Sequence, residues 1–421
     1  MAYAWRASAE RAILTGLARD PPERSVATAE PRTAAQARPV SFALVSERSA
    51  FDALEPEWND LFRRAGRDTQ LFQTFNWNWH WANHYLTATP GQGRRRSLAI
   101  VTVRRSGRLV MLWPLIAERI AGLEVLRWMG EPVSQYGDVL AEATPDTGEL
   151  MRQAWHFIVT RVGADALFLR KVRADATIAP LLRALGARRT AVAAAPYLDL
   201  ASAPDFAAYE QRYSAKARKN RRRLMRRLEE RGAVAIERHA GGAHARAAAL
   251  EAIALKRAWL EATGRVSPAL ADPRFAAFFA DAAEGRGRPS GCAVTMLKSN
   301  GETAGIAIDV TCGARRAAHV IVHDPSLDPF SPGTLLLQEW IRRASADRIA
   351  TFDLLAPAYA YKSDWADATV AVEDFALGLT LPGRAWVHVY LGAARERLKA
   401  AVEALSRGLA WLRPRAEARG A

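Results

Sequence analysis

The chain has 421 residues, of which 50% are hydrophobic, and its formal net charge is +15. This length exceeds what one compact core usually supports, so we expect two domains. The best candidate for a membrane span, Val110 to Ile116, is short and contains Pro114, which disfavours a membrane-spanning protein. The positive charge predicts an anionic partner, such as nucleic acid, a phosphorylated cofactor, anionic lipid or an acidic polysaccharide precursor.

The cysteines and histidines do not form a metal-binding pattern. Cys292 and Cys312 provide neither a disulfide framework nor a metal-ligand spacing, which favours a reducing, cytoplasmic setting. His80 and His84 stand four residues apart on an expected helix, as metal ligands can. However, the glutamate of an HExxH motif is missing and no third ligand accompanies them. We therefore predict no metal site.

The first half of the chain alternates strands and helices after a polar start. Residues 1–39 are rich in Ala, Arg and Pro and have no apolar periodicity, so we expect a mostly disordered tail. Residues 40–203 then predict an N-terminal domain of ordinary size. Its expected strands are 40–46, 98–103, 109–116, 125–128, 136–140, 166–171 and one that ends at Leu200, and its expected helices are 51–64, 71–86, 149–162 and 178–185.

The second half, residues 204–385, predicts another domain of mixed α and β structure. It opens with a long basic helix over 206–231, in which ten Lys and Arg residues between 212 and 231 face only Glu229 and Glu230. An Asn300-Gly301 turn indicates a hairpin within an antiparallel meander. The expected strands are 234–238, 292–297, 303–311, 316–322, 350–355 and 370–381, and the helices are 245–261, 273–283 and 334–343, with a C-terminal helix over 386–412 of the final segment 386–421. Both halves follow a similar order, which we interpret as a weak internal duplication.

Residues 318–365 read as strand, loop, helix and strand, followed by a polar, aromatic-rich turn. The helix is expected to open at Ser331-Pro332-Gly333-Thr334, where Pro costs no hydrogen bond and Gly leaves backbone N–H groups uncovered. Uncovered N–H groups at the positive end of a helix dipole can bind an anion. The alternative is an ordinary crossover in an α/β core, because a fold alone does not imply a function.

Several motifs, taken together and in order, carry a family resemblance over most of residues 40–385. They are FQTFNWNWHW, GEPVSQYGDVL, SAKARKNRRRLMRRLEERG, ALKRAW, DPSLDPFSPGTLLLQEWI and FDLLAPAYAYKSDW. With these motifs the chain resembles the CelD/BcsL-type acyltransferases of bacterial polysaccharide biosynthesis, which belong to the GNAT superfamily and share a FemAB-like tandem arrangement. The resemblance implies two GNAT-like domains, each a mixed, mostly antiparallel sheet flanked by helices. It also implies acyl transfer from acyl-CoA, acetyl-CoA foremost, to an amine or hydroxyl of a saccharide or other small polar acceptor, without a permanently bound cofactor.

The resemblance assigns the cofactor loop to the start of the helix near residue 332. Backbone groups of Ser331, Gly333 and Thr334 would hold the CoA pyrophosphate, and Lys362 could bind a CoA phosphate or an anionic acceptor. The sequence departs here from the usual glycine-rich loop, since Ser331 and Pro332 stand where Gly and an apolar residue are expected.

Three residues are the candidates for proton transfer. The resemblance implies that Tyr361 protonates the departing CoA thiolate, as a general acid within hydrogen-bond reach would. Asp353 and His323, at the ends of two facing strands, could reach a common point and act as the base for the acceptor.

Four residues of the first half are candidates for substrate contact. Ser134, Tyr136 and Asp138 lie in a polar turn between apolar strands, where acceptor groups are often bound. Trp77, in an aromatic helix, could line a sugar or acyl pocket. The alternative for these residues is turn capping and core packing.

Two other function classes stay open. FemAB relatives suggest an aminoacyl-tRNA-dependent transferase, and the basic helix suggests a non-catalytic binder of RNA or an anionic surface on a degenerate GNAT scaffold. Residues 212–231 could also contact an anionic membrane peripherally. The chain has no RNP, KH or Cys/His module, and its arginines lack interleaved aromatics, which disfavours nucleic acid as the partner.

Overall fold

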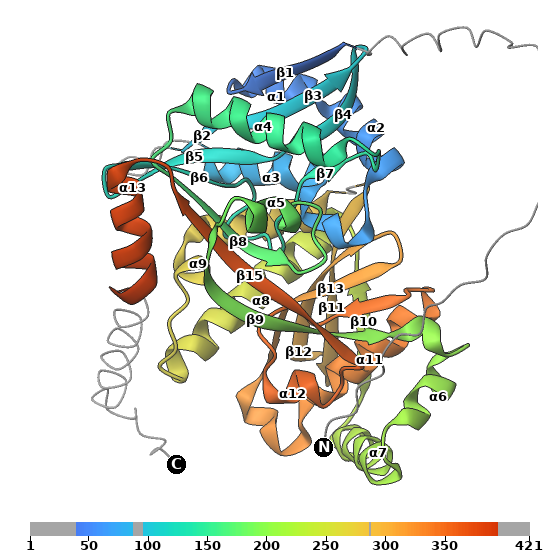
Figure 1. The fold of residues 1–421 in the computed structure, drawn as a ribbon. Helices are drawn as coiled ribbons and strands as arrows, with labels where there is room; N and C mark the ends of the chain where they lie inside the picture. The colour runs from blue at the N-terminus through green and yellow to red at the C-terminus, as the bar shows by residue number, and fades with distance from the viewer. Residues whose placement is uncertain (1–38, 87–95, 286–287, 395–421) are drawn as a thin grey trace, which may run out of the picture. The chain divides into compact units, whose positions relative to one another are not determined.

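The structure is a computed structural model that describes residues 39–86, 96–285 and 288–394. Its strands form two sheets, with helices packed beside them (Figure 1). The smaller, four-stranded sheet has the order β1-β3-β4-β7 and is antiparallel throughout. Its strands are β1 (Val40–Val45), β3 (Ile100–Arg105), β4 (Arg108–Trp113) and β7 (Leu140–Ala141).

The larger sheet has eleven strands in the order β10-β11-β12-β13-β14-β9-β15-β8-β6-β5-β2. They are β2 (Arg96–Leu98), β5 (Leu115–Ile120), β6 (Leu123–Trp128), β8 (Ala166–Arg173), β9 (Arg188–Asp199), β10 (Val234–His239), β11 (Ser290–Ser299), β12 (Glu302–Cys312), β13 (Arg315–His323), β14 (Thr351–Asp353) and β15 (Ala368–Gly378). The neighbours β6 and β8, and β13 and β14, are parallel, whereas the other neighbours are antiparallel. The expectation of a mixed, mostly antiparallel α/β fold is confirmed.

The last strand of each half pairs with the other half. β9, from the first half, lies beside β14, with Asp199 opposite Thr351. β15, from the second half, lies beside β8, with Val372 opposite Arg173, and also pairs with β9. Because of this exchange, strands from both halves of the chain belong to one continuous sheet. The proposed division into domains 40–203 and 204–385 stays a prediction.

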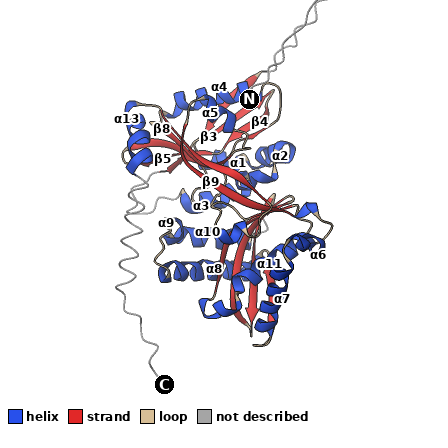
Figure 2. Cartoon of the chain, turned by 60° about the horizontal axis from the view of Figure 1, so that its bottom comes forward, coloured by secondary structure: helices blue, strands red, loops and turns tan. Residues whose placement is uncertain are grey.

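Helices flank the strands of the second half on two faces. Figure 2 shows α8 and α10 on one side of these strands and α7 and α11 on the other. The helices are α1 (Arg48–Ala53), α2 (Glu55–Ala65), α3 (Phe75–Tyr85), α4 (Thr147–Val162), α5 (Ala179–Ala184), α6 (Phe206–Tyr209), α7 (Ala215–Glu229), α8 (Gly242–Ala262), α9 (Pro268–Ala271), α10 (Pro273–Glu284), α11 (Pro332–Ala346), α12 (Ala360–Ser363) and α13 (Leu381–Ala385). A buried apolar cluster joins α3 of the first half to α8, α10 and the β11–β13 meander, so the two halves share a core.

Two expected helices are shorter than the sequence suggested. The aromatic helix begins at Phe75 rather than residue 71, because residues 68–73 form 3-10 turns. The basic helix is broken at Tyr213, whose backbone is extended, and α7 begins after Ser214, whose hydroxyl caps the Ala217 N–H.

Two further expectations concern strand 136–140 and the C-terminal helix. The expected strand is reduced to β7, because the preceding loop is tied down by side-chain bonds, including one from Gln73 to the Tyr136 carbonyl. At the C-terminus, Trp386–Ala394 forms π-helical turns. The rest of the expected helix, like the expected tail over residues 1–38, lies outside the described residues.

Candidate active site

The parallel strands β13 and β14 pair only briefly before an opening appears between them. Arg315 to Ala317 lie opposite Thr351 to Asp353, where β14 ends, while β13 continues to His323. His319 has no opposite residue on β12, because the register shifts between Ile308 and Asp309. Beyond Ala317, β13 stays paired with β12 but has no partner on the β14 side among the described residues, which leaves backbone groups and space that a ligand can occupy.

A cavity of about 310 Å³ lies at this opening. Its central walls are residues 318–321 of β13 and residues 354–357 after β14. Phe275 of α10 lines it from one face of the sheet, and Leu337 and Trp340 of α11 line it from the other. The cavity therefore connects the two faces of the sheet through the opening between β13 and β14.

Tyr361 and Lys362, both expected in the site, line this cavity from the short helix α12. The Tyr361 side chain stays 43% exposed, and burial of its ring together with Tyr359 raises its pKa to about 12. Lys362 is buried and its Nζ donates a hydrogen bond to the Leu355 carbonyl over 2.9 Å. Tyr361 is thus a protonated hydroxyl at neutral pH, placed on the cavity wall.

Asp353 lies behind the cavity and is fully buried. Its carboxylate accepts hydrogen bonds from the Tyr136 hydroxyl at 2.8 Å and from Arg315 at 3.0 Å. The Leu355 N–H donates to it at 2.9 Å, and Arg173 lies 3.5 Å away. With two arginines and two further donors, Asp353 has the partners of a buried structural ion.

His323 is distant from Asp353 along the sheet. Asp353 lies opposite Ala317, and His323 is six residues further along β13, which corresponds to about 20 Å of strand. His323 instead hydrogen-bonds Asp328 over 2.8 Å and lies beside Gly333, where a Cβ atom would meet its Nδ1 at 2.9 Å. The structure does not bring His323 and Asp353 to a common point, and their roles as bases stay predictions.

The expected cofactor loop forms the start of α11. Ser331 adopts a left-handed conformation with φ of 51°, and Pro332 is the first helical residue. The Ser331 carbonyl accepts a hydrogen bond from the Thr334 N–H over 3.0 Å, which closes part of the first turn. Binding of CoA by Ser331, Gly333 and Thr334 stays a prediction.

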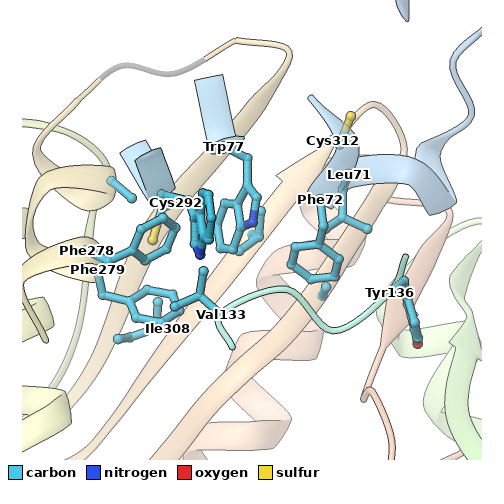
Figure 3. Close-up of a cluster of buried hydrophobic side chains, with 14 of the residues drawn as sticks. Leu71, Phe72, Trp77, Val133, Tyr136, Phe278, Phe279, Cys292, Ile308 and Cys312 are labelled. Carbon is cyan, nitrogen blue, oxygen red and sulfur yellow. The ribbon is translucent and has the colours of Figure 1, made fainter. Parts of the chain in front are cut away.

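The four expected substrate residues are packed inside the protein rather than along the cavity lining. Trp77 is buried near Phe278 (Figure 3), and their ring centroids are 4.7 Å apart. The Trp77 indole N–H donates to the Ser134 hydroxyl. Asp138 accepts hydrogen bonds from Gln70 and from backbone N–H groups. Tyr136 is bonded to Asp353. A role in substrate contact stays a prediction for all four.

Three residues that the sequence did not single out line the cavity. Lys171 comes from β8 and Lys256 from α8, and burial lowers the pKa of each to about 8. The third is His319, whose pKa burial lowers to about 4. The Val133 carbonyl lies 2.6 Å from its Nε2, so Nε2 carries the hydrogen. The buried Nδ1 keeps its lone pair and has no hydrogen-bond partner within the described residues. The rarity of lysine in this arginine-rich chain is the signal that could have marked Lys171 and Lys256.

The remaining candidates from the sequence are a histidine pair and two cysteines. His84 pairs with Asp281 over 2.7 Å, and the described ranges contain no group of three or more His, Cys, Asp or Glu residues that could hold a metal ion. Cys292 and Cys312 are buried free thiols. In the same ranges, no helix is both long and apolar enough to cross a membrane.

Residues 215–363 match the family model described as an acetyltransferase (GNAT) domain. This stretch runs from the start of α7 to the end of α12 and contains β13, α11, β14 and Tyr361. The expectation of a GNAT-type acyltransferase domain in the second half is confirmed. No curated protein matches the chain.

Solved structures with a similar fold include FemX, with a TM-score of 0.51 at 11% identity, covering 72% of this chain and 96% of FemX. A tandem GNAT protein from the clavulanic acid biosynthesis pathway has a TM-score of 0.45 at 14% identity, and the match covers 81% of this chain and 98% of that chain. The C-terminal domain of a putative lysylphosphatidylglycerol synthetase from Agrobacterium fabrum has a TM-score of 0.47 at 11% identity, and the match covers 84% of this chain and 96% of that domain. At such identities, the likeness concerns the fold alone.

Proposed function

We propose that the chain transfers an acyl group from acyl-CoA, acetyl-CoA foremost, to an amine or hydroxyl of a saccharide or other small polar acceptor. The observation that carries the proposal is the cavity at the opening between β13 and β14, within the GNAT domain. A donor on the α11 face and an acceptor on the α8 and α10 face could meet there. Each would then be held by a separate set of side chains.

Tyr361 is the proposed general acid. Attack on the thioester carbonyl gives a tetrahedral intermediate, from which the CoA thiolate departs and must receive a proton. A tyrosine with a pKa of about 12 is protonated at neutral pH and lines the cavity. Its hydroxyl can supply that proton and regain one from solvent through its exposed side.

The N-terminus of α11 is the proposed site for the CoA phosphates. Its first turn carries Ser331, Gly333 and Thr334 at the positive end of a 15-residue helix. Lys362, which lines the same cavity as Tyr361, is the proposed ligand of a CoA phosphate or of an anionic acceptor. We further propose a cytoplasmic role in polysaccharide or envelope biosynthesis, on the resemblance to the CelD/BcsL-type enzymes.

Calorimetry and a thiol-release assay on the full chain test the proposal. We expect saturable binding of acetyl-CoA and turnover with an amino-sugar or amino-acid acceptor. Tyr361→Phe should lower turnover ~10²-fold or more without weakening acetyl-CoA binding. Tyr390→Phe, in the π-helical turns outside the cavity lining, is the matched control. Full activity of Tyr361→Phe would remove Tyr361 from the mechanism.

A second candidate is aminoacyl transfer from tRNA, which the FemX-like fold and the basic helix α7 favour. Charged tRNA should then bind in preference to acetyl-CoA, and its binding should weaken steeply with salt. If RNA binds without any transfer, the non-catalytic alternative is favoured instead.

A further inference from the structure

The cavity between β13 and β14 gathers lysines in a chain that has few of them. Only seven lysines occur among the 59 lysines and arginines. Three of them, Lys171, Lys256 and Lys362, line this one cavity, whereas no arginine appears in its lining among the described residues. They come from β8, α8 and α12, which are far apart in the sequence. Three independent elements therefore place the same functional group around one cavity.

Each ammonium group keeps hydrogen-bonding capacity for a ligand. Lys171 donates to the Ser134 carbonyl at 3.2 Å and to Gln135 at 2.7 Å. Lys256 donates to the Ile321 carbonyl at 3.2 Å, and Lys362 donates to the Leu355 carbonyl at 2.9 Å. A lysine ammonium has three N–H donors. Counted over the described residues, each of the three lysines thus has at least one N–H left.

No carboxylate offsets these charges inside the cavity. The lining contains no Asp or Glu in the described part of the chain. Asp353, whose charge acts on Lys362, is bonded to Arg315 and Tyr136 behind the wall. Glu131 and Asp374, also outside the lining, act on Lys171. Burial outweighs these carboxylates and lowers the pKa values of the ammonium groups, because a buried charge is costly. An anionic ligand would remove that cost.

Two of the lysines, Lys171 and Lys256, lie on the face of the sheet opposite α11. Lys256 belongs to α8, and Lys171 donates to Gln135, whose amide nitrogen lies 3.3 Å from Nε2 of His319. The His319 ring packs against Phe279 of α10, with centroids 4.7 Å apart. The α8 and α10 face is the one assigned above to the acceptor, whereas the α11 face is assigned to the donor.

We propose, resting on the acyl transfer proposed above, that the acceptor carries a small anionic group, a carboxylate or phosphate, and that Lys171, Lys256 and Lys362 bind it. In the reaction the carbonyl carbon–sulfur bond breaks and a bond to the acceptor nitrogen or oxygen forms. The acceptor releases one proton to solvent, and the CoA sulfur gains one through Tyr361. The lysines position the nucleophile and do not themselves react.

The test compares acceptors that differ in the anionic group. Glucosamine 6-phosphate is compared with glucosamine, and L-alanine with L-alaninamide, by kcat/KM for thiol release from acetyl-CoA with the full chain. We expect at least one anionic member to be preferred by about tenfold or more, as for a charge-assisted hydrogen bond. Lys256→Met should abolish that preference, and Lys256→Arg should retain most of it. Lys298→Met, whose lysine bonds Thr303 in the β11–β12 hairpin, is the control that should leave the preference unchanged.

Calorimetry separates this inference from the proposed function. Acetyl-CoA should bind Lys256→Met as it binds the unmodified chain. If acetyl-CoA does not bind the unmodified chain, the proposed transfer fails, and glucosamine 6-phosphate and L-alanine are then titrated alone. Binding of either that is lost in Lys256→Met still supports the anion site, and no binding of either overturns it.

Three kinetic results would overturn the acceptor assignment. The first is equal use of both members of each pair, and the second is an equal loss for both members in Lys256→Met. The third is a preference for succinyl-CoA over acetyl-CoA that Lys256→Met removes, with no preference among acceptors. That third result would place the anion on the donor.

Discussion

The Tyr136 hydroxyl donates a hydrogen bond to Asp353 over 2.8 Å and so connects the loop after β6 to the end of β14. Burial and the neighbouring carboxylate hold the pKa of Tyr136 well above its ordinary value. Arg315 and Arg173 form ion pairs with the same Asp353 carboxylate, with Nη1–Oδ2 distances of 3.0 and 3.5 Å. This network holds the edge of the opening at which the cavity lies.

We predict that Asp353→Asn destabilises the protein by about 3 kcal/mol, the lower end for a broken buried ion pair, because Arg315 and Arg173 lose the carboxylate they share. Each arginine keeps one other partner, Asp68 for Arg315 and Asp175 for Arg173. Tyr136→Phe, which removes one neutral donor, should cost about 1–2 kcal/mol. Urea unfolding measures both changes in the free energy of unfolding. If Asp353→Asn unfolds like the unmodified chain but loses the acidic limb of its pH–rate profile, where a base must give up its proton, Asp353 is the catalytic base instead.

The His323 ring lies where a side chain on Gly333 would be. We predict that Gly333→Ala weakens acetyl-CoA binding several-fold, because its Cβ would stand 2.9 Å from Nδ1 and displace the start of α11. Adding His323→Ala should restore the affinity, since it removes the obstructing ring. Gly148→Ala, in α4 with no atom within 4 Å of the added Cβ, is the control.

The single variant His323→Ala also tests its role as a base. If His323 only packs, kcat should be unchanged while the Gly333→Ala defect is suppressed. A large loss of kcat in His323→Ala alone, with acetyl-CoA affinity intact, would return His323 to the mechanism and contradict the packing interpretation.

We predict that kcat/KM for an anionic acceptor falls as pH rises through about 8. The pKa values of Lys171, Lys256 and Lys362 are each lowered to about 8, mainly by burial. Arg170 lowers the pKa of Lys171 further, whereas Glu131 and Asp374 raise it. Arg265 lowers the pKa of Lys256 further. Asp353 raises the pKa of Lys362, and Lys256 lowers it. The protonated lysines bind the anion, so binding is present below this pH and lost above it.

Stability should change in the opposite direction, which distinguishes the two effects. A lysine with a folded pKa of about 8 and an unfolded pKa near 10.4 destabilises the fold while protonated, so its penalty disappears as pH rises through this window. Loss of activity above pH 8 therefore cannot be ascribed to unfolding by these groups. A pH profile of kcat/KM for glucosamine 6-phosphate beside that for glucosamine measures the difference; parallel profiles would contradict the prediction.

The sequence predicts those parts of the fold that local chemistry determines. The Asn300-Gly301 turn marks the β11–β12 hairpin, because both residues adopt the positive φ that such turns require. Pro332 marks the first residue of α11. The exchange of β9 and β15 between the halves depends on pairing between residues that are more than 150 positions apart in the sequence, and no local pattern signals such pairing.

The candidate site was only partly predictable for the same reason. Tyr361 and Lys362 are adjacent in a motif and both line the cavity. Lys171 and Lys256 reach it from other elements, and only tertiary structure brings them together. Local pattern was also misleading in the basic segment, where the sequence predicts one helix over 206–231 but the structure has a break at Tyr213.

The last prediction concerns Arg221 in α7, which contacts the ring of Tyr213 at this break. The guanidinium of Arg221 lies 4.4 Å from the ring centroids of both Tyr213 and Trp365, while the next residue, Arg222, is exposed. Arg221→Ala should cost about 2 kcal/mol of stability, because it removes two cation–π contacts and the packing of its stem. Arg222→Ala should change stability by less than about 0.5 kcal/mol.

The two variants remove the same charge, so they also separate docking from anion binding by α7. If α7 contacts an anionic membrane, both should weaken binding to vesicles containing phosphatidylglycerol by a similar factor, and more so at low salt. If the helix only docks against the core, neither should matter to vesicles, and urea unfolding alone should distinguish them. Equal stability of the two variants would show that the contacts of Arg221 with the Tyr213 and Trp365 rings do not hold α7 in place.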